Sequence, residues 1–138
     1  MYKKLLVAVD GSENSLRAAK HAAHIASLSE NCSVTIVYVA DYSKVQSEVL
    51  YESFEELKEE NRKKIVPAEE IFQNKHISYT VEILQGMPGQ TIVNYANKHG
   101  FDMLIIGSRG LNALQKMVLG SVSHKVVKGA DCPVLVVK

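Results

Sequence analysis

Two glycine-rich stretches have the residue types of an anion-binding site. The first is Gly107-Ser108-Arg109-Gly110, and nine residues separate it from the second, Gly120-Ser121-Val122-Ser123. Glycine tolerates a positive φ and lets the backbone approach a ligand without a Cβ clash. Because a helix is expected to begin at Gly120 or Ser121, unpaired N–H groups and the helix dipole would favour an anion there. The pattern predicts a phosphate cradle, with Ser121 and Ser123 as hydroxyl donors. Ordinary turn glycines and a helix cap at Ser121 are the alternative.

Asp10 is the second candidate, because it ends the first apolar run of the chain. If that run is a central strand, its carboxylate faces the crevice of the sheet. There it would bind a ribose hydroxyl or, through water, a phosphate-bound Mg²⁺. It would equally well cap the following helix or fix the turn at Gly11, and the sequence leaves both interpretations open.

Several catalytic classes are excluded by motifs that the sequence lacks. It has no GxxxxGK[ST], and no GxGxxG follows the first strand, which excludes a P-loop NTPase and the usual dinucleotide-binding fingerprint. Ser108 stands in a Gly-Ser-x-Gly context, not in the Gly-x-Ser-x-Gly nucleophile elbow of hydrolases. His21 and His24 are three residues apart on a predicted helix, but no third ligand is evident nearby, so no metal site is predicted.

The elements that would position these residues alternate between apolar, strand-like runs and helical stretches. Strands are expected at Lys4–Val9, Ser33–Val39, Ser78–Leu84, Asp102–Ile106 and Pro133–Val137. Helices are expected at Glu13–Ser29, Ser47–Asn74, Pro88–Lys98 and Gly120–Gly129, with Pro67 kinking or restarting the second. The alternation predicts an α/β fold with an open parallel sheet and helices on both faces. In such sheets ligands bind beyond the carboxyl ends of the strands, where both candidate sites stand.

Length and charge limit the function further. The 138 residues predict a single domain, 1–138, and 46% hydrophobic residues suffice for a core. A net charge of +1 argues against a general nucleic-acid or membrane-surface binder, since those need a dense cationic face. No stretch has the roughly 20 apolar residues needed to cross a bilayer. With Cys32 and Cys132 alone and no CxxC, the sequence predicts a cytoplasmic protein with free, buried thiols.

Taken together, these motifs resemble those of the universal stress protein family. Gly107-x2-Gly110-x9-Gly120-Ser121 fits the family's Gly-x2-Gly-x9-Gly-Ser/Thr motif with no departure in spacing. The opening Val7–Ser12 resembles the family's N-terminal stretch, and Gly86-x-Pro88 before a helix also fits. Ala130–Val137 resembles the closing strand of the family, so that the resemblance covers the whole chain.

The resemblance implies a Rossmann-like sheet with strand order 3-2-1-4-5 and a homodimer, which in many members pairs the last strand with its copy. It also implies ATP binding, because members that keep the glycine motif form the ATP-binding branch. The regions of Val9, Asp10 and Val39 would hold adenosine. The phosphates would lie against Gly107, Arg109, Gly110, Gly120, Ser121, Val122 and Ser123, with Mg²⁺ bound through phosphates and water.

Two functions follow from these expectations. The first is a homodimeric, ATP-dependent switch with little or no turnover, in which nucleotide orders the loop 108–119 and alters a surface for a protein partner. The second is a slow, Mg-dependent ATPase or adenylate-handling enzyme. Binding is favoured over turnover, since Asp10 is the only obvious carboxylate and no lysine has P-loop geometry. A dimerisation module without nucleotide is a third alternative, which the intact glycine motif disfavours.

Overall fold

Five strands and four helices alternate along the chain in the computed structural model, which describes residues 1–40, 51–110 and 118–138. The strands are β1 (Lys4–Ala8), β2 (Ser33–Ala40), β3 (Tyr79–Gln85), β4 (Met103–Gly107) and β5 (Val134–Val137). The helices are α1 (Glu13–Ser27), α2 (Tyr51–Asn74), α3 (Pro88–His99) and α4 (Ser121–Gly129). Every predicted element is present with limits close to those expected, and the predicted start of the second helix at Ser47 lies outside the described residues.

The five strands form one parallel sheet in the order β3-β2-β1-β4-β5, which confirms the predicted order. β1 is central, and its Val7 pairs with Ile36 of β2 on one side and Ile105 of β4 on the other. The chain first builds the sheet outward from β1 to β3 and then continues on the opposite side with β4. Open α/β sheets bind ligands at such a reversal, beyond the carboxyl ends of the strands.

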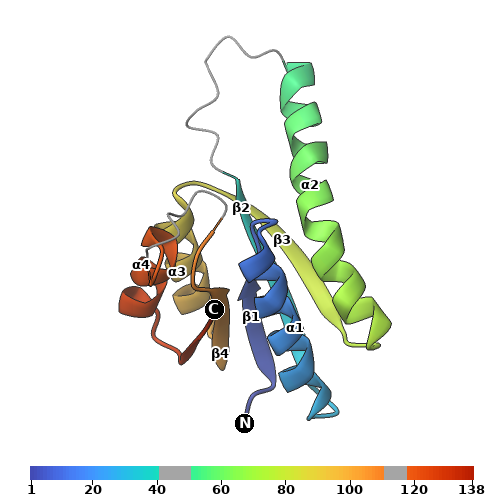
Figure 1. Ribbon diagram of the computed structural model, residues 1–138, viewed down its shortest axis with the longest axis vertical. Coiled ribbons are helices and arrows are strands. Elements are labelled where there is room, and N and C mark those ends of the chain that lie inside the picture. The colour runs from blue at the N-terminus through green and yellow to red at the C-terminus, as the bar shows by residue number, and fades with distance from the viewer. Residues whose placement is uncertain (41–50, 111–117) are drawn as a thin grey trace.

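Two hydrophobic cores lie on opposite faces of the sheet, because successive residues of a strand point to opposite sides. Leu5 and Val7 of β1 pack in one core with residues of α1 and α2. Leu6 and Ala8 pack in the other core with residues of α3 and α4. Figure 1 shows the resulting three layers, with α1 and α2 on one side of the sheet and α3 and α4 on the other.

The first turn of α1 is placed beside the end of β4. Ser12 caps the helix as predicted, since its hydroxyl accepts a hydrogen bond from the Ser15 amide at 3.2 Å. The helix buries a face of small residues, which allows close packing against the sheet: Ala18, Ala19, Ala22, Ala23 and Ala26. A Cβ on Gly107 would lie only 2.9 Å from the backbone carbon of Asn14. The alanine face and this glycine together bring α1 against the candidate site.

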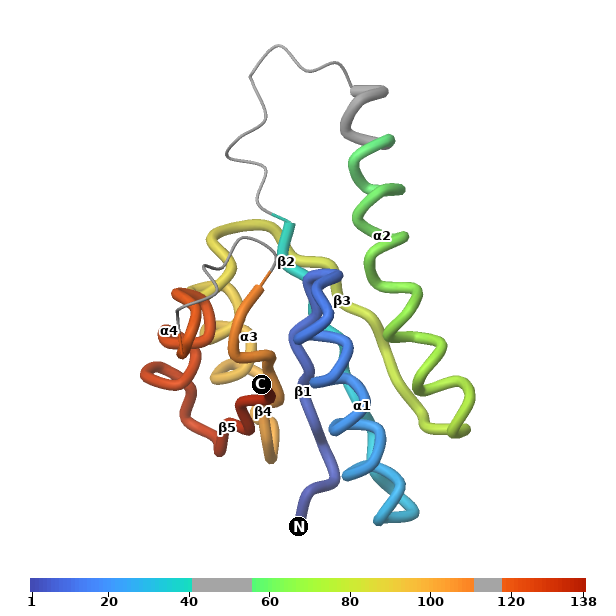
Figure 2. The backbone as a smooth tube through the Cα atoms, viewed as in Figure 1, coloured from blue at the N-terminus to red at the C-terminus, as the bar shows by residue number. Residues whose placement is uncertain are grey.

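α2 is a single helix that continues through Pro67, so the proline does not restart it. Ile65, Ala68 and Phe72 bury one side of the helix in the first core. Figure 2 shows α2 extending past the carboxyl end of β2, and therefore past the edge of the sheet where the candidate site lies.

Neither membrane helices nor disulfides are found in the described ranges. None of their helices is long and apolar enough to span a bilayer. Cys32 and Cys132 are free thiols, and burial raises the pKa of each. Cys32 is buried as predicted, whereas Cys132 is only half-buried because it precedes β5 at the edge of the sheet.

Candidate functional site

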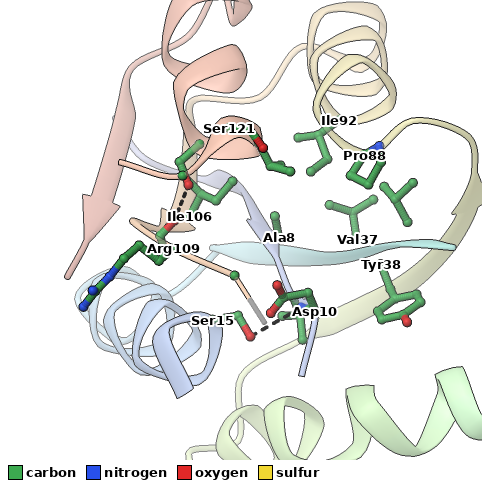
Figure 3. Close-up of a pocket in the computed structure, with 17 residues that line it drawn as sticks. Ala8, Asp10, Ser15, Val37, Tyr38, Pro88, Ile92, Ile106, Arg109 and Ser121 are labelled. Carbon is green, nitrogen blue, oxygen red and sulfur yellow. Dashed lines mark hydrogen bonds between the residues drawn. The ribbon is translucent and has the colours of Figure 1, made fainter. Parts of the chain in front are cut away.

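A pocket of about 370 Å³ opens at the carboxyl ends of β1, β2 and β4, beside the starts of α3 and α4 (Figure 3). All ten residues that the sequence analysis selected as nucleotide contacts line this pocket. They are Val9, Asp10, Val39, Gly107, Arg109, Gly110, Gly120, Ser121, Val122 and Ser123. The fold therefore gathers residues from both halves of the sequence at one place.

The glycine turn after β4 is joined directly to the first turn of α4 by two hydrogen bonds. The Gly120 amide donates to the Ser108 carbonyl at 2.7 Å, and the Ser123 hydroxyl donates to the Gly107 carbonyl at 2.6 Å. Gly120 is the N-cap of α4 and has no side chain that could satisfy the amides of the first helical turn. These amides and the positive end of the helix dipole have the chemistry that favours an anion, and we call this part the anion-binding end of the pocket.

The two serines at the start of α4 differ in what their hydroxyl groups can do. Ser123 is buried, and it donates its single hydroxyl proton to Gly107. That proton is therefore committed within the protein, which corrects the expectation that Ser123 is a donor to phosphate. Ser121 is exposed and lines the pocket, and its role as a hydroxyl donor to phosphate stays a prediction.

The glycines of the turn are required by space. A Cβ on Gly110 would lie 2.6 Å from Oδ2 of Asp10, and a Cβ on Gly107 would meet the backbone of Asn14 at 2.9 Å. Neither Gly107 nor Gly110 has a positive φ. The structure thus shows close approach to other parts of the chain, and the expected close approach to a ligand stays a prediction. A left-handed backbone conformation is not found at these two positions.

Asp10 takes part in a turn and faces the pocket at the same time. Its Oδ1 accepts a hydrogen bond from the Ser12 amide at 2.9 Å, and its own amide donates to the Ser15 hydroxyl at 3.3 Å. The other carboxylate oxygen, Oδ2, lies beside Gly110 at the pocket. The sequence left two structural roles open for Asp10, capping α1 and fixing the turn at Gly11. Because Ser12 caps the helix, Asp10 has the second role and stabilises the turn. Its Oδ2 is placed to accept a hydrogen bond from a ligand.

Arg109 lines the pocket, but its charged end is directed elsewhere. In Figure 3 the guanidinium points away from Asp10, Ser121 and Ile92. The side chain is half-buried. In this arrangement the anion-binding end of the pocket depends on backbone amides and not on the arginine charge.

Seven pocket residues were not among those predicted from the sequence. They are Ala8, Ser15, Val37, Tyr38, Pro88, Ile92 and Ile106. Most are apolar. Val37, Pro88 and Ile92 lie together on the side of the pocket away from Arg109 (Figure 3), and with Val39, which packs in the same core as Val37 and Ile92, they form the apolar end of the pocket. Tyr38 is additionally held from α2, because its hydroxyl donates to Oδ1 of Asn61 at 2.9 Å. Position was the only signal that could have found them, since they stand near the ends of strands or near the starts of α1 and α3.

The loop expected to contact a protein partner, residues 108–119, is described only in part. Residues 111–117 lie outside the described residues. Ser108 is buried within the fold, whereas Val118 is 81% exposed and Leu119 half-buried. An exposed apolar side chain therefore stands just before Gly120 at the pocket.

No group of three His, Cys, Asp or Glu side chains suited to a metal ion occurs in the part of the chain that the structure describes. His21 and His24 are both exposed on α1. Any cation at the pocket would accordingly need ligands besides the protein side chains described there.

Comparison with known proteins identifies the family. Residues 1–138 match the sequence profile of the universal stress protein family. Universal stress protein MJ0531 of Methanocaldococcus jannaschii is 37% identical over 142 aligned positions, which cover 100% of this chain and 83% of that protein.

Solved structures agree with this match. Universal stress protein MJ0577 of the same organism has a structure that is 33% identical, with a TM-score of 0.89 over 100% of this chain and 96% of that one. A universal stress protein solved in complex with cAMP is 25% identical, with a TM-score of 0.68 over 99% of this chain and 97% of that one. The profile match, the sequence identity and the shared fold together show that the chain belongs to the universal stress protein family.

Proposed function

We propose that this protein is a homodimeric switch of the stress response that binds ATP with Mg²⁺ and turns it over slowly or not at all. The observation that carries the proposal is that the two ends of the pocket differ in polarity. An anion-binding end, made by the glycine turn and the first turn of α4, adjoins an apolar end. A nucleotide has matching chemistry, because its charged phosphates are joined to a flat base with apolar faces.

The apolar end supports an adenine base. Val37 and Val39 of β2 and Ile92 of α3 line it and would contact the faces of the base. For Asp10 two contacts stay open, either a ribose hydroxyl or, through water, the Mg²⁺ held by the phosphates. The relative that was solved with cAMP adds support for an adenine nucleotide, since it shares the fold and 25% of the residues.

A magnesium ion fits this pocket only as a companion of the phosphates. Mg²⁺ takes oxygen ligands and keeps several waters. Among the described residues that line the pocket, Asp10 alone carries a carboxylate. Asp10 would bind a water of the ion, and the ion would neutralise part of the phosphate charge.

A slow Mg-dependent ATPase or adenylate-handling enzyme is the second candidate. It is favoured by one observation, the position of Asp10 Oδ2 beside Gly110, where a carboxylate could orient a water toward phosphate. Against efficient turnover, no lysine lines the pocket among the described residues, and the Arg109 guanidinium points away from it. Phosphate release from Mg-ATP that is much faster in the wild type than in Asp10→Asn would reverse our preference.

We propose that the partner of the homodimer meets β5. Among the described strands β5 pairs only with β4, so its outer edge offers unpaired backbone groups to a second copy of the chain. Val136 is half-buried and packs against the second core, so Val136→Glu places a charge on this edge strand and beside that core. It should shift the protein toward monomer in sedimentation experiments, and thermal melting shows whether the variant is folded. An unchanged tight dimer would mean that the interface lies elsewhere.

The loop 108–119 would present a different surface to a protein partner in the cytoplasm when nucleotide is bound than when it is absent. Its described apolar residue Val118 is exposed close to the pocket, so that closure of the loop on nucleotide would change an apolar surface. Comparing partner capture with and without ATP would test this part of the proposal, and equal capture in both states would contradict it.

Thermal melting of nucleotide-stripped protein, with and without Mg-ATP, tests the nucleotide site. Ligand at about 100 times its Kd adds about 2.7 kcal/mol to the free energy of unfolding. For a domain of this size the midpoint should rise by about 8 °C. GTP at the same concentration is the control for base selectivity. The absence of any shift with millimolar ATP or AMP would refute a nucleotide site.

A further inference from the structure

Ser108 is the one residue of the turn Gly107–Gly110 that does not line the pocket. It is 3% exposed and is hydrogen-bonded in three directions. Its amide donates to the Val137 carbonyl at 2.7 Å, and its carbonyl accepts from the Gly120 amide at 2.7 Å. Its hydroxyl accepts from Nδ2 of Asn14 at 3.1 Å. Ser108 therefore links β5, the start of α4 and the first turn of α1.

The Asn14 side chain is held in one orientation by its other neighbour. Nη2 of Arg17 donates to Oδ1 of Asn14, and a guanidinium group has donors only. The Nδ2 donor of the amide is consequently the end that faces Ser108. Arg17 is itself fixed, because its Nε donates to the Lys138 carbonyl at 2.9 Å. The orientation of Asn14 is thus determined by α1 and the end of β5, independently of any ligand.

The bond between Asn14 and Ser108 controls the position of the anion-binding amides. Asn14 is 9% exposed, so moving Ser108 away would leave a buried amide donor without its acceptor. Ser108 also carries the start of α4 with it, because its carbonyl accepts the Gly120 amide. These hydrogen bonds hold the turn in place without a ligand. Binding therefore does not have to offset the conformational entropy of ordering the turn.

We infer that Asn14 and Ser108 are positioning residues of the nucleotide site, acting on its phosphate end from behind the pocket wall. The inference rests on the proposed function, since it concerns the phosphate end of that same site. It predicts a selective effect. Loss of the bond weakens binding of the phosphate group and leaves binding of the base unchanged, because β2 and α3 form the apolar end.

NMR titration with AMP and with adenosine tests this selectivity, because it reaches millimolar affinities. Asn14→Ala and Ser108→Ala should each weaken AMP binding about tenfold, as expected for one buried hydrogen bond, and leave adenosine affinity unchanged. The double variant should bind AMP no more weakly than the weaker single variant, since both changes remove the same contact.

Asn97→Ala, at an exposed asparagine with the same number of side-chain hydrogen bonds, is the control. The Asn97 amide also makes two hydrogen bonds, to the Gly129 carbonyl at 3.0 Å and from the Asp131 amide at 2.9 Å, but at the far end of α4. Its loss should leave the ratio of AMP to adenosine affinity unchanged. Thermal midpoints of all variants show which of them are folded. If Asn14→Ala does not fold, Ser108→Ala is used for the test, because it removes a single oxygen atom.

Each outcome decides the inference. If AMP and adenosine affinities fall by the same factor, or neither changes, the two residues have a general structural role and the inference is overturned. If the wild type binds neither adenosine, AMP nor ATP, the proposed function fails and the inference fails with it, which is evident before any variant is compared.

Discussion

The two ends of the pocket are built in different ways. The anion-binding end consists largely of backbone, with the turn after β4 bonded to the start of α4 through Gly120 and Ser123. The apolar end consists of side chains, among them Val37 and Val39 of β2 and Ile92 of α3. One end is defined by where the chain runs, and the other by the volume and shape of its side chains.

The two ends therefore tolerate different substitutions. Backbone amides cannot be replaced by mutation. Binding at the first end is therefore weakened by changes that displace the turn, either an added Cβ or the loss of a hydrogen bond that holds it. Side chains of similar volume can substitute for one another at the second end with small effects. The first end would bind the phosphates of any nucleotide, and selection of the base would depend on the second.

Gly120→Val should have the largest effect on binding. The backbone has a φ of −69° at Gly120, and a Cβ would find its nearest neighbours at 3.4 Å and 3.5 Å, so the added Cβ itself is accommodated. Thermal melting shows whether the variant with its two methyl groups is folded. The valine methyl groups would cover the amides of the first turn of α4. We expect AMP and ATP affinity, measured by calorimetry, to fall about 100-fold through the lost charge-assisted hydrogen bonds.

Thr80→Val is a suitable control for Gly120→Val. Thr80 is exposed on the edge strand β3, where its hydroxyl oxygen lies 3.4 Å from that of Thr35. Valine is well tolerated in strands, and this variant should bind AMP like the wild type. Undiminished AMP binding by a folded Gly120→Val protein would mean that the phosphates do not lie at α4.

The sequence predicted the fold well because the physical requirements of the sheet appear directly in it. Central strands are buried on both faces, so Lys4–Val9 and Asp102–Ile106 are nearly continuous apolar runs. Alternation with helices then predicts a parallel sheet. The strand order came from the family resemblance, since alternation alone does not determine on which side of β1 each strand is added.

Residue patterns predicted the backbone end of the candidate site and Asp10, whereas at the apolar end Val39 was named only through the family resemblance. Glycines required by close approach, such as Gly110 beside Asp10, leave a spacing that can be recognised. Val37 and Ile92 leave no such mark, because the same residue types fill the second core, of which both are also members.

The hydrogen-bond partners of the Ser123 hydroxyl and the Asn14 amide could not be predicted from the sequence, for another reason. Nothing in the sequence tells that Ser123 donates to Gly107 within the protein. Asn14 acts on Ser108, which lies 94 positions away in the sequence. Such roles depend on where a side chain points, which only the folded chain determines.

Val39→Ala should show the tolerance of the apolar end. Val39 is half-buried and lines the pocket, so the change removes two methyl groups without emptying a closed core. We expect adenosine and AMP affinity to fall together, each about fivefold, because both ligands share the base that loses the contact. NMR titration of both ligands measures this, and Val127→Ala, on an exposed apolar residue of α4 outside the pocket lining, is the control. A loss confined to AMP would contradict the division of the pocket into two ends.

Asp10→Asn should have the smallest effect and decides to which end Asp10 belongs. Asparagine keeps the Oδ1 acceptor for the Ser12 amide, so the fold should be retained while the charge beside Gly110 is lost. Without Mg²⁺, ATP affinity should rise about threefold, because a carboxylate no longer repels the phosphates. With Mg²⁺ it should fall about threefold, since the hydrated ion loses an anionic acceptor. Equal losses in both conditions, shared by adenosine, would instead mean that Asp10 acts on the ribose and belongs functionally with the apolar end.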